Sequence, residues 1–130
     1  MGTFSFDYSE FMRGAKKAVA DVQKASKNAT NTGVKVVAAN ISSSVPVRTG
    51  GLKNSISVKN ARKGEYYDYY AQAYFNGTDE HGVRYGLIAA VNEYGKHGQA
   101  ARPFVRPALE NPNVAEAMRA AWNETEVTKT

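Results

Sequence analysis

Few residues of this chain have the types and spacing that metal or acid–base chemistry needs. The two histidines, His81 and His97, both lie in glycine-flanked stretches, and there are no cysteines. Neither a Ser-His-Asp arrangement nor a His-pair metal site can therefore be drawn. Asp79 and Glu80 precede His81 and could hold a cation loosely, but an exposed loop of mixed charge is the favoured interpretation. We expect no metal site.

Two further stretches could support chemistry, and each has a simpler interpretation. Glu93 could act as a general base, but no second titratable group stands at a readable distance, so pairing with an arginine such as Arg102 in the same loop is preferred. The glycine pair at 50–51, between Arg48 and Lys53, could cradle a phosphate through backbone N–H groups, although a plain turn is favoured. No nucleotide-binding loop or nucleophile-elbow motif is present. We expect no catalytic residue, no cofactor and no enzymatic activity.

Composition is that of an ordinary globular protein. The chain has 130 residues, of which 42% are hydrophobic and 22% charged, so a single domain over residues 1–130 is expected. No apolar run approaches the roughly 18 residues that a membrane span needs. The first residues lack the basic and apolar regions of a signal peptide. We expect a soluble protein assembled in the cytoplasm, with no membrane partner and with flexible ends at 1–8 and 124–130.

Charge is distributed unevenly along the chain. Residues 1–63 carry eleven basic and three acidic side chains, whereas residues 64–130 carry six and nine. Such asymmetry is typical of nucleic-acid contact, of one subunit meeting its neighbour, or simply of a solvated basic helix face. The tyrosine-rich stretch 66–75 could stack bases, although interior tyrosines with bonded hydroxyls are favoured. A stand-alone basic nucleic-acid-binding module is therefore the alternative to a structural role.

Periodicity predicts a long helix followed by a hairpin. Apolar residues recur at helical spacing from Phe11 to Ala29 and resume one position out of step after Gly33. We expect either one helix kinked at Gly33 or two helices on one axis, ending near residues 42–44. Alternating residues then predict antiparallel strands over 56–59 and 66–75, joined by a turn. A polar loop over 76–82 should be the most mobile segment.

The last third of the chain predicts helices separated by an extended segment. Residues 83–94 are assigned to a short helix, although Gly86 weakens it. Two prolines predict that residues 102–106 run extended, with Phe104 as the core anchor. A helical turn should follow, and Asn113 should cap a final helix with a buried apolar stripe. The fold class is therefore α+β, with a long N-terminal helix and a small antiparallel sheet made of the hairpin and a short extended segment.

Two stretches of the chain carry recognisable signatures. VPVRTGGLKNSI, at 45–56, has the pattern P-x-x-T-G-x-L-x-x-S-I. NEYG followed by ARPFVRPALE, at 92–110, is similar to E-[FY]-G-T … R-P-F-[LI]-x-P-A, with Lys96 at the usual threonine. Together, and in this order among the expected helices and strands, they resemble the signatures of a small minor tail component of long-tailed double-stranded DNA phages. Matched positions taken as structural are Pro46, Gly50, Leu52, Ile56, Tyr94, Gly95, Pro103, Phe104 and Pro107.

The resemblance implies a tail-completion or neck protein of the virion. Such a protein is a subunit of a homo-oligomeric ring, expected to be hexameric, between the tail tube and the head connector. Its partners are other copies of itself, adjacent neck or connector proteins, and tail-tube or terminator proteins, with loose non-specific contact to DNA in the lumen. The loop 76–82 is expected to order against the next ring. The residues expected near subunit or ring contacts are Arg48, Thr49, Lys53, Glu93, Lys96, Arg102 and Arg106.

Overall fold

The computed structural model describes residues 8–46, 50–65 and 69–125, so most of the predicted flexible ends lie outside the described residues. The predicted α+β class is confirmed. No helix in the described part of the chain is long and apolar enough to cross a membrane. In chain order the elements are α1 (Tyr8–Ser44), α2 (Gly51–Asn54), β1 (Ile56–Lys63), β2 (Tyr69–Phe75), α3 (Tyr85–Tyr94), α4 (Val105–Glu110) and α5 (Pro112–Glu124).

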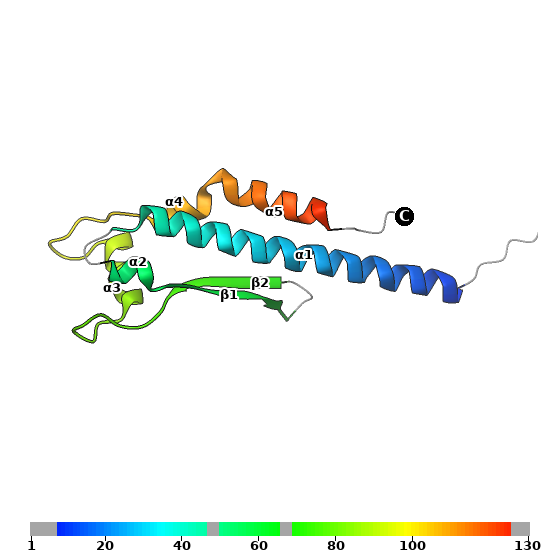
Figure 1. The fold of residues 1–130 in the computed structure, drawn as a ribbon, viewed down its shortest axis with the longest axis horizontal. Helices are drawn as coiled ribbons and strands as arrows, with labels where there is room; N and C mark the ends of the chain where they lie inside the picture. The colour runs from blue at the N-terminus through cyan, green and yellow to red at the C-terminus, as the bar shows by residue number, and fades with distance from the viewer. Residues whose placement is uncertain (1–7, 47–49, 66–68, 126–130) are drawn as a thin grey trace, which may run out of the picture.

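The organising element is α1, a single helix of 37 residues that spans about 55 Å. Of the two predicted alternatives, a single long helix is confirmed and two helices on one axis is wrong; α1 runs through Gly33 without interruption, and no sharp kink is seen there (Figure 1). Gly33 instead allows a close approach, since a Cβ there would lie 2.7 Å from the sulfur of Met118. The glycine therefore accommodates α5 rather than bending α1.

The other elements cover α1 on two sides (Figure 1). The β1–β2 hairpin packs along one side, and α4 and α5 pack along the other. An amide pair fixes the second contact: Asn40 Nδ2 donates to Asn113 Oδ1 at 2.8 Å, and Asn113 Nδ2 donates to Asn40 Oδ1 at 3.0 Å. Asn40 also donates to the Ala108 carbonyl at 3.1 Å. One side chain of α1 thus holds both C-terminal helices.

The predicted hairpin is confirmed, and its sheet has two strands among the described residues. The strands pair from Ile56 with Phe75 to Lys63 with Tyr69, with a register shift between Lys59 and Arg62. Ala61, in this irregular stretch, donates its N–H to the Asn31 side chain of α1. A polar residue of α1 therefore satisfies a backbone donor near the point where the ladder changes register.

The two faces of β2 differ over residues 69–73 as the alternation predicted, whereas Tyr74, on the outer face, is half-buried. Tyr69, Ala71 and Ala73 are half-buried, whereas Tyr70 and Gln72 are exposed. The preference for interior tyrosines is therefore wrong for Tyr70, which lies on the outer face. The predicted residues 66–68 of this strand lie outside the described residues.

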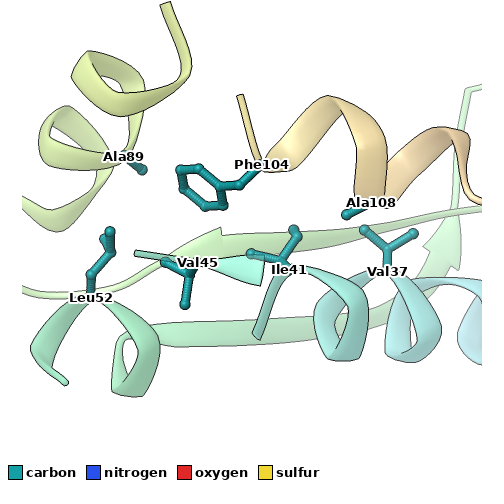
Figure 2. Packing of buried hydrophobic residues seen from close by; sticks show 7 residues of the cluster. All are labelled: Val37, Ile41, Val45, Leu52, Ala89, Phe104 and Ala108. Atoms are coloured by element: carbon teal, nitrogen blue, oxygen red, sulfur yellow. The ribbon is translucent and has the colours of Figure 1, made fainter. Parts of the chain in front are cut away.

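The core lies where the C-terminal end of α1 meets α2, α3 and α4 (Figure 2). Phe104 is buried, as predicted, and its ring meets that of Phe75 edge to face at 6.0 Å. This contact ties the segment before α4 to the last residue of the hairpin. The buried members of the cluster are Val37, Ile41, Val45, Leu52, Ala89, Phe104 and Ala108.

Two boundaries near the C-terminus differ from prediction. Residues 102–106 are not extended throughout, because α4 begins at Val105, and Pro107 lies in its first turn, where no N–H is needed. The cap of α5 is Asn111 rather than Asn113: its Oδ1 accepts from the Asn113 N–H at 3.0 Å. Pro112 is pre-organised for the first helical position, which shifts the start of α5 by two residues. The apolar stripe of α5 is half-buried, with no fully buried member.

Candidate interaction surface and its scaffold

The first signature folds into a tight corner that leads into β1. Gly50 has φ 81°, the left-handed region that favours glycine. Gly51 begins α2, and a Cβ there would collide with the Tyr85 hydroxyl of α3. Leu52 enters the core, and the buried Ser55 donates its hydroxyl to the Leu52 carbonyl at 2.7 Å. Gly51 and Leu52 therefore serve the packing of α2 against α3 and the core, whereas Gly50 and Ser55 cap the two ends of α2.

The second signature is organised by one buried carboxylate. Glu93, in the last turn of α3, reaches across to the start of α4. Its Oε2 accepts from the N–H groups of Phe104 and Val105, each at 2.8 Å, and its Oε1 accepts from the N–H of Arg106 at 3.0 Å. These N–H groups at the beginning of α4 have no carbonyl partner within the helix. Glu93 therefore caps a helix that begins twelve residues later in the chain.

Burial and hydrogen bonding act in opposite directions on Glu93. Burial by itself would raise the pKa of the carboxyl group. The N–H donors of Val105, Phe104 and Arg106, together with the positive charge of Arg106, outweigh burial and hold the pKa below its ordinary value. Pairing with an arginine such as Arg102 was the preferred prediction for Glu93; the main partners are instead the backbone N–H groups, and the arginine whose charge adds to them is Arg106. The charge of Glu93 serves to position α4.

The loop between α3 and α4 closes on itself. Gly95 ends α3 with φ 77°, and a Cβ there would lie 2.9 Å from both the Ala101 nitrogen and the Gln99 carbonyl oxygen. Lys96 and Gln99 exchange backbone hydrogen bonds of 3.0 and 2.9 Å. The N–H of Arg102 donates to the Asn92 carbonyl at 2.6 Å. The two halves of the second signature are thus held side by side.

The two signatures meet in one core. Leu52 of the first signature and Phe104 of the second lie in the same buried cluster, which also contains Ala89 of α3 (Figure 2). Ile56 packs against this cluster from the start of β1. The two signatures lie about forty residues apart in the sequence, and the fold brings them to the same end of α1 (Figure 1).

The residues predicted at contacts fall into three groups. Lys53, Lys96 and Arg102 are exposed. Arg106 is also exposed and forms an ion pair with Glu110, Nε to Oε1 at 3.0 Å. Glu93 lies in the interior and so presents no surface. Arg48 and Thr49 lie outside the described residues.

The positions assigned to structural motifs differ in burial. Tyr94 has a side chain that is 82% exposed, so it adds surface rather than core. Pro103 and Pro107 are also exposed and act through the backbone. Pro46 and Gly95 are half-buried. The exposed Tyr94 ring is therefore available for contact with another molecule.

The acidic cluster near His81 has a local structural role. Asp79 Oδ1 accepts from the N–H groups of His81, at 2.9 Å, and Val83, at 2.8 Å. Glu80 lies 3.4 Å from the imidazole of His81, with both side chains exposed. Among the described residues there is no group of three metal-ligating side chains. The side chain of Asp79 holds the loop that leads into α3.

The outer face of the hairpin carries a feature that the sequence analysis missed. Lys59 Nζ lies 5.1 Å from the centroid of the Tyr74 ring, and the Arg62 guanidinium lies 5.0 Å from that of Tyr70. Arg62 also donates to Gln72 Oε1 at 2.7 Å. The alternation of β2 indicated that Tyr70, Gln72 and Tyr74 share a face, but the register with β1 was needed to place the cations over it. The result is a basic and aromatic surface.

Fold and site together define a small α+β protein built on one long helix, whose two signatures brace its core. A protein-family model matches residues 9–81, which include α1, the first signature and the hairpin. The chain belongs to this family, described as "Bacteriophage HK97-gp10, putative tail-component". The family gives the chain a phage tail-related structural role and a virion-associated location. Comparisons with curated proteins and with solved structures found no match.

Proposed function

We propose that the chain is a subunit of a homo-oligomeric ring at the head–tail junction of the virion, joining the tail tube to the head connector. Its partners are other copies of itself, in a ring expected to have six members, and the adjacent connector and tail-tube or terminator proteins. We also propose that it has no enzymatic activity. The observation that carries the proposal is that both signatures serve to brace one end of an elongated molecule in a phage tail family.

The use of Glu93 supports the structural role. It is the one buried ionisable side chain among the residues whose burial the structure describes. Both of its oxygens accept hydrogen bonds from the backbone, and its pKa is lowered, so it is a poor proton acceptor. The residue of the second signature best suited to acid–base chemistry therefore stabilises the fold instead.

Exposed cations on the braced elements supply the proposed contact surface. Lys53 lies on α2, and Lys96 and Arg102 lie on the loop between α3 and α4. These elements gather at the C-terminal end of α1 (Figure 1). A rigid end of this kind loses little conformational entropy when it meets a partner. We assign ring or connector contacts to this surface.

Phage complementation tests the proposal. Particles that lack the chain should accumulate as separate heads and tails, and the wild-type chain should restore joined particles. A Lys96→Glu/Arg102→Glu variant should fold but join heads to tails at least tenfold less often, because paired charge reversal at a contact costs several kcal/mol. Arg119→Glu, at an exposed site on α5, is the matched control. Full joining by the double variant would contradict the assigned surface, and joined particles without the chain would contradict the function.

The outer face of the hairpin favours a second candidate function, binding of nucleic acid. Cations stacked on tyrosine rings can contact phosphates and single-stranded bases. A stand-alone module should bind DNA tightly, with a steep salt dependence that Arg62→Ala reduces by about one unit of slope. A ring subunit should bind weakly, as expected for a lumen through which DNA must slide. Gel-shift titrations across salt concentrations separate the two.

A further inference from the structure

One face of α1 carries a line of basic side chains. All six Lys and Arg residues between positions 13 and 35 lie within an arc of about 100° around the helix axis. At 1.5 Å per residue, the line is about 33 Å long. The six side chains are exposed. We call them the basic face of α1, which consists of Arg13, Lys16, Lys17, Lys24, Lys27 and Lys35.

The described chain brings little negative charge to this face. Asp21 is the only acidic residue between positions 13 and 35, and it lies about 40° beyond the edge of the face. Glu124 of α5 lines an open groove together with Lys24 and Lys35. The ion pairs found among the described residues include no member of the face. The basic face therefore keeps a net positive charge.

The spacing of the cations is unfavourable for the helix alone. Arg13 stands three residues before Lys16 and four before Lys17. Lys24 likewise stands three residues before Lys27. Residues at these spacings are neighbours on a helix, and like charges there destabilise it. A bound polyanion would offset this repulsion, so a ligand explains the row of cations better than solubility, which charges of both signs also provide.

We propose that the basic face of α1 binds the phosphate backbone of double-stranded DNA. Duplex DNA carries one negative charge per about 1.7 Å of its axis, and one helical turn is about 34 Å long. A straight row of cations about 33 Å long therefore spans about one turn of the duplex. A protein surface usually mixes charges of both signs, so a long row of one sign matches DNA better than it matches an acidic protein.

The residue types indicate contact with phosphates rather than with base edges. Five of the six cations are lysines, whose ammonium group is a point charge and lacks the fork with which arginine reads guanine. Asn28 and Asn31 line the groove beside Lys24 and Lys35, and each amide carries two N–H donors. Contacts to phosphates carry no sequence information. The site should therefore bind duplexes of any sequence.

The proposed ring does not depend on this contact, and the second candidate site on the hairpin is separate from it. The outer face of the hairpin points away from α1, because Ala61 on the inner face donates to Asn31 of α1. Within a ring, the contact would place the basic face of α1 toward the passage for DNA.

Fluorescence anisotropy of a labelled duplex of about two helical turns, mixed with the full chain, tests the site. Titrations cover about 50 to 200 mM salt. With six phosphate contacts, the logarithm of the binding constant should fall with the logarithm of the salt concentration with a slope of about −5. Lys16→Gln/Lys27→Gln should make the slope about 2 units shallower and weaken binding at least tenfold at the lowest salt. Neither lysine is three or four residues from Asp21, so the change leaves neighbours of that residue intact.

A matched control removes the same charge elsewhere. Arg84→Gln/Arg119→Gln changes two exposed sites, at the start of α3 and on α5. Arg119 lies about 160° around α5 from Ala121, which lines the groove. The control should keep the slope of the wild type. Circular dichroism should show the same helix content for all three chains.

Three outcomes would overturn the site. The first is equal slopes for the wild type, Lys16→Gln/Lys27→Gln and the control. The second is a loss of slope in Arg62→Ala with none in Lys16→Gln/Lys27→Gln, which would place the contact on the hairpin. The third is binding of poly-L-glutamate as tight as that of the duplex at equal charge, since the duplex releases more counterions and should bind at least tenfold more tightly. The ring fails separately, if heads and tails join without the chain.

Discussion

The cap that Glu93 provides for α4 predicts a specific loss of stability on substitution. Glu93→Gln keeps the shape of the side chain but replaces one acceptor oxygen with a donor, so it loses one of three charge-assisted hydrogen bonds and weakens the others. A hydrogen bond to a charged group contributes about 1.5–3 kcal/mol, which gives a cost of about 2 kcal/mol for Gln. Glu93→Ala leaves all three N–H groups without this acceptor and should cost about 4 kcal/mol.

The free energy of unfolding that Glu93→Gln loses relative to the wild type should also depend on pH, in a direction fixed by the lowered pKa of Glu93. The unfolded chain protonates this carboxyl near pH 4.3, about its ordinary value. The folded chain resists protonation until a lower pH, so the charged cap contributes its full stability above the unfolded pKa. That contribution is lost as the pH falls through the folded pKa. The free energy of unfolding of the wild type should therefore approach that of Glu93→Gln between pH 7 and pH 3.

Urea unfolding, followed by the fluorescence of Trp122, measures both effects. Trp122 is the single tryptophan of the chain and is half-buried on α5, so it reports on tertiary packing. Glu116→Gln, at an exposed site on α5, is the control and should change stability by under about 0.5 kcal/mol at any pH. A Glu93→Gln variant as stable as the wild type at pH 7, or one whose deficit stays constant to pH 3, would refute this account of the second signature.

Three further stability predictions follow from the same scaffold, each measured by urea or thermal unfolding. Phe104→Ala should cost about 3–5 kcal/mol, the range for a buried phenylalanine, and a neutral result would contradict its role as anchor. Gly95→Ala should lower the free energy of unfolding more than Gly98→Ala. Both glycines have φ near 80°, so both variants carry the left-handed penalty of about 1–2 kcal/mol. Of the two, only Gly95 has backbone atoms within 3 Å of the new Cβ. Gly51→Ala should destabilise the chain, and Tyr85→Phe in the same chain should recover part of the loss, since it removes the colliding hydroxyl.

Elements with a clear period could be predicted from the sequence. The long helix, the hairpin and the short helix over 83–94 were predicted, because their apolar residues repeat at 3.6 or 2 positions and must be buried on one side. The burial of Phe104 followed from its place between two prolines. The helical period could not reveal that Gly33 makes room for α5, since only the approach of Met118 from α5 distinguishes a glycine needed for packing from one that kinks a helix.

The contacts that fix the candidate site depend on distant residues, which explains the remaining differences. Arg106 precedes a proline and would ordinarily avoid the helical region. It is helical here, in a turn whose N–H groups bind the carboxylate of Glu93. Similarly, Asn31 and Asn40 appear in the sequence as polar interruptions of a helix, and their roles depend on Ala61 and Asn113. Local patterns carry no signal for such pairings.

The central claim, that this chain forms a ring at the head–tail junction, is tested most directly by an image reconstruction of that junction in the native virion. The account predicts several copies of an elongated α+β subunit, arranged in a closed ring with α1 resolved as one unbroken helix in each. A single copy of the chain, or copies at another part of the particle, would contradict it.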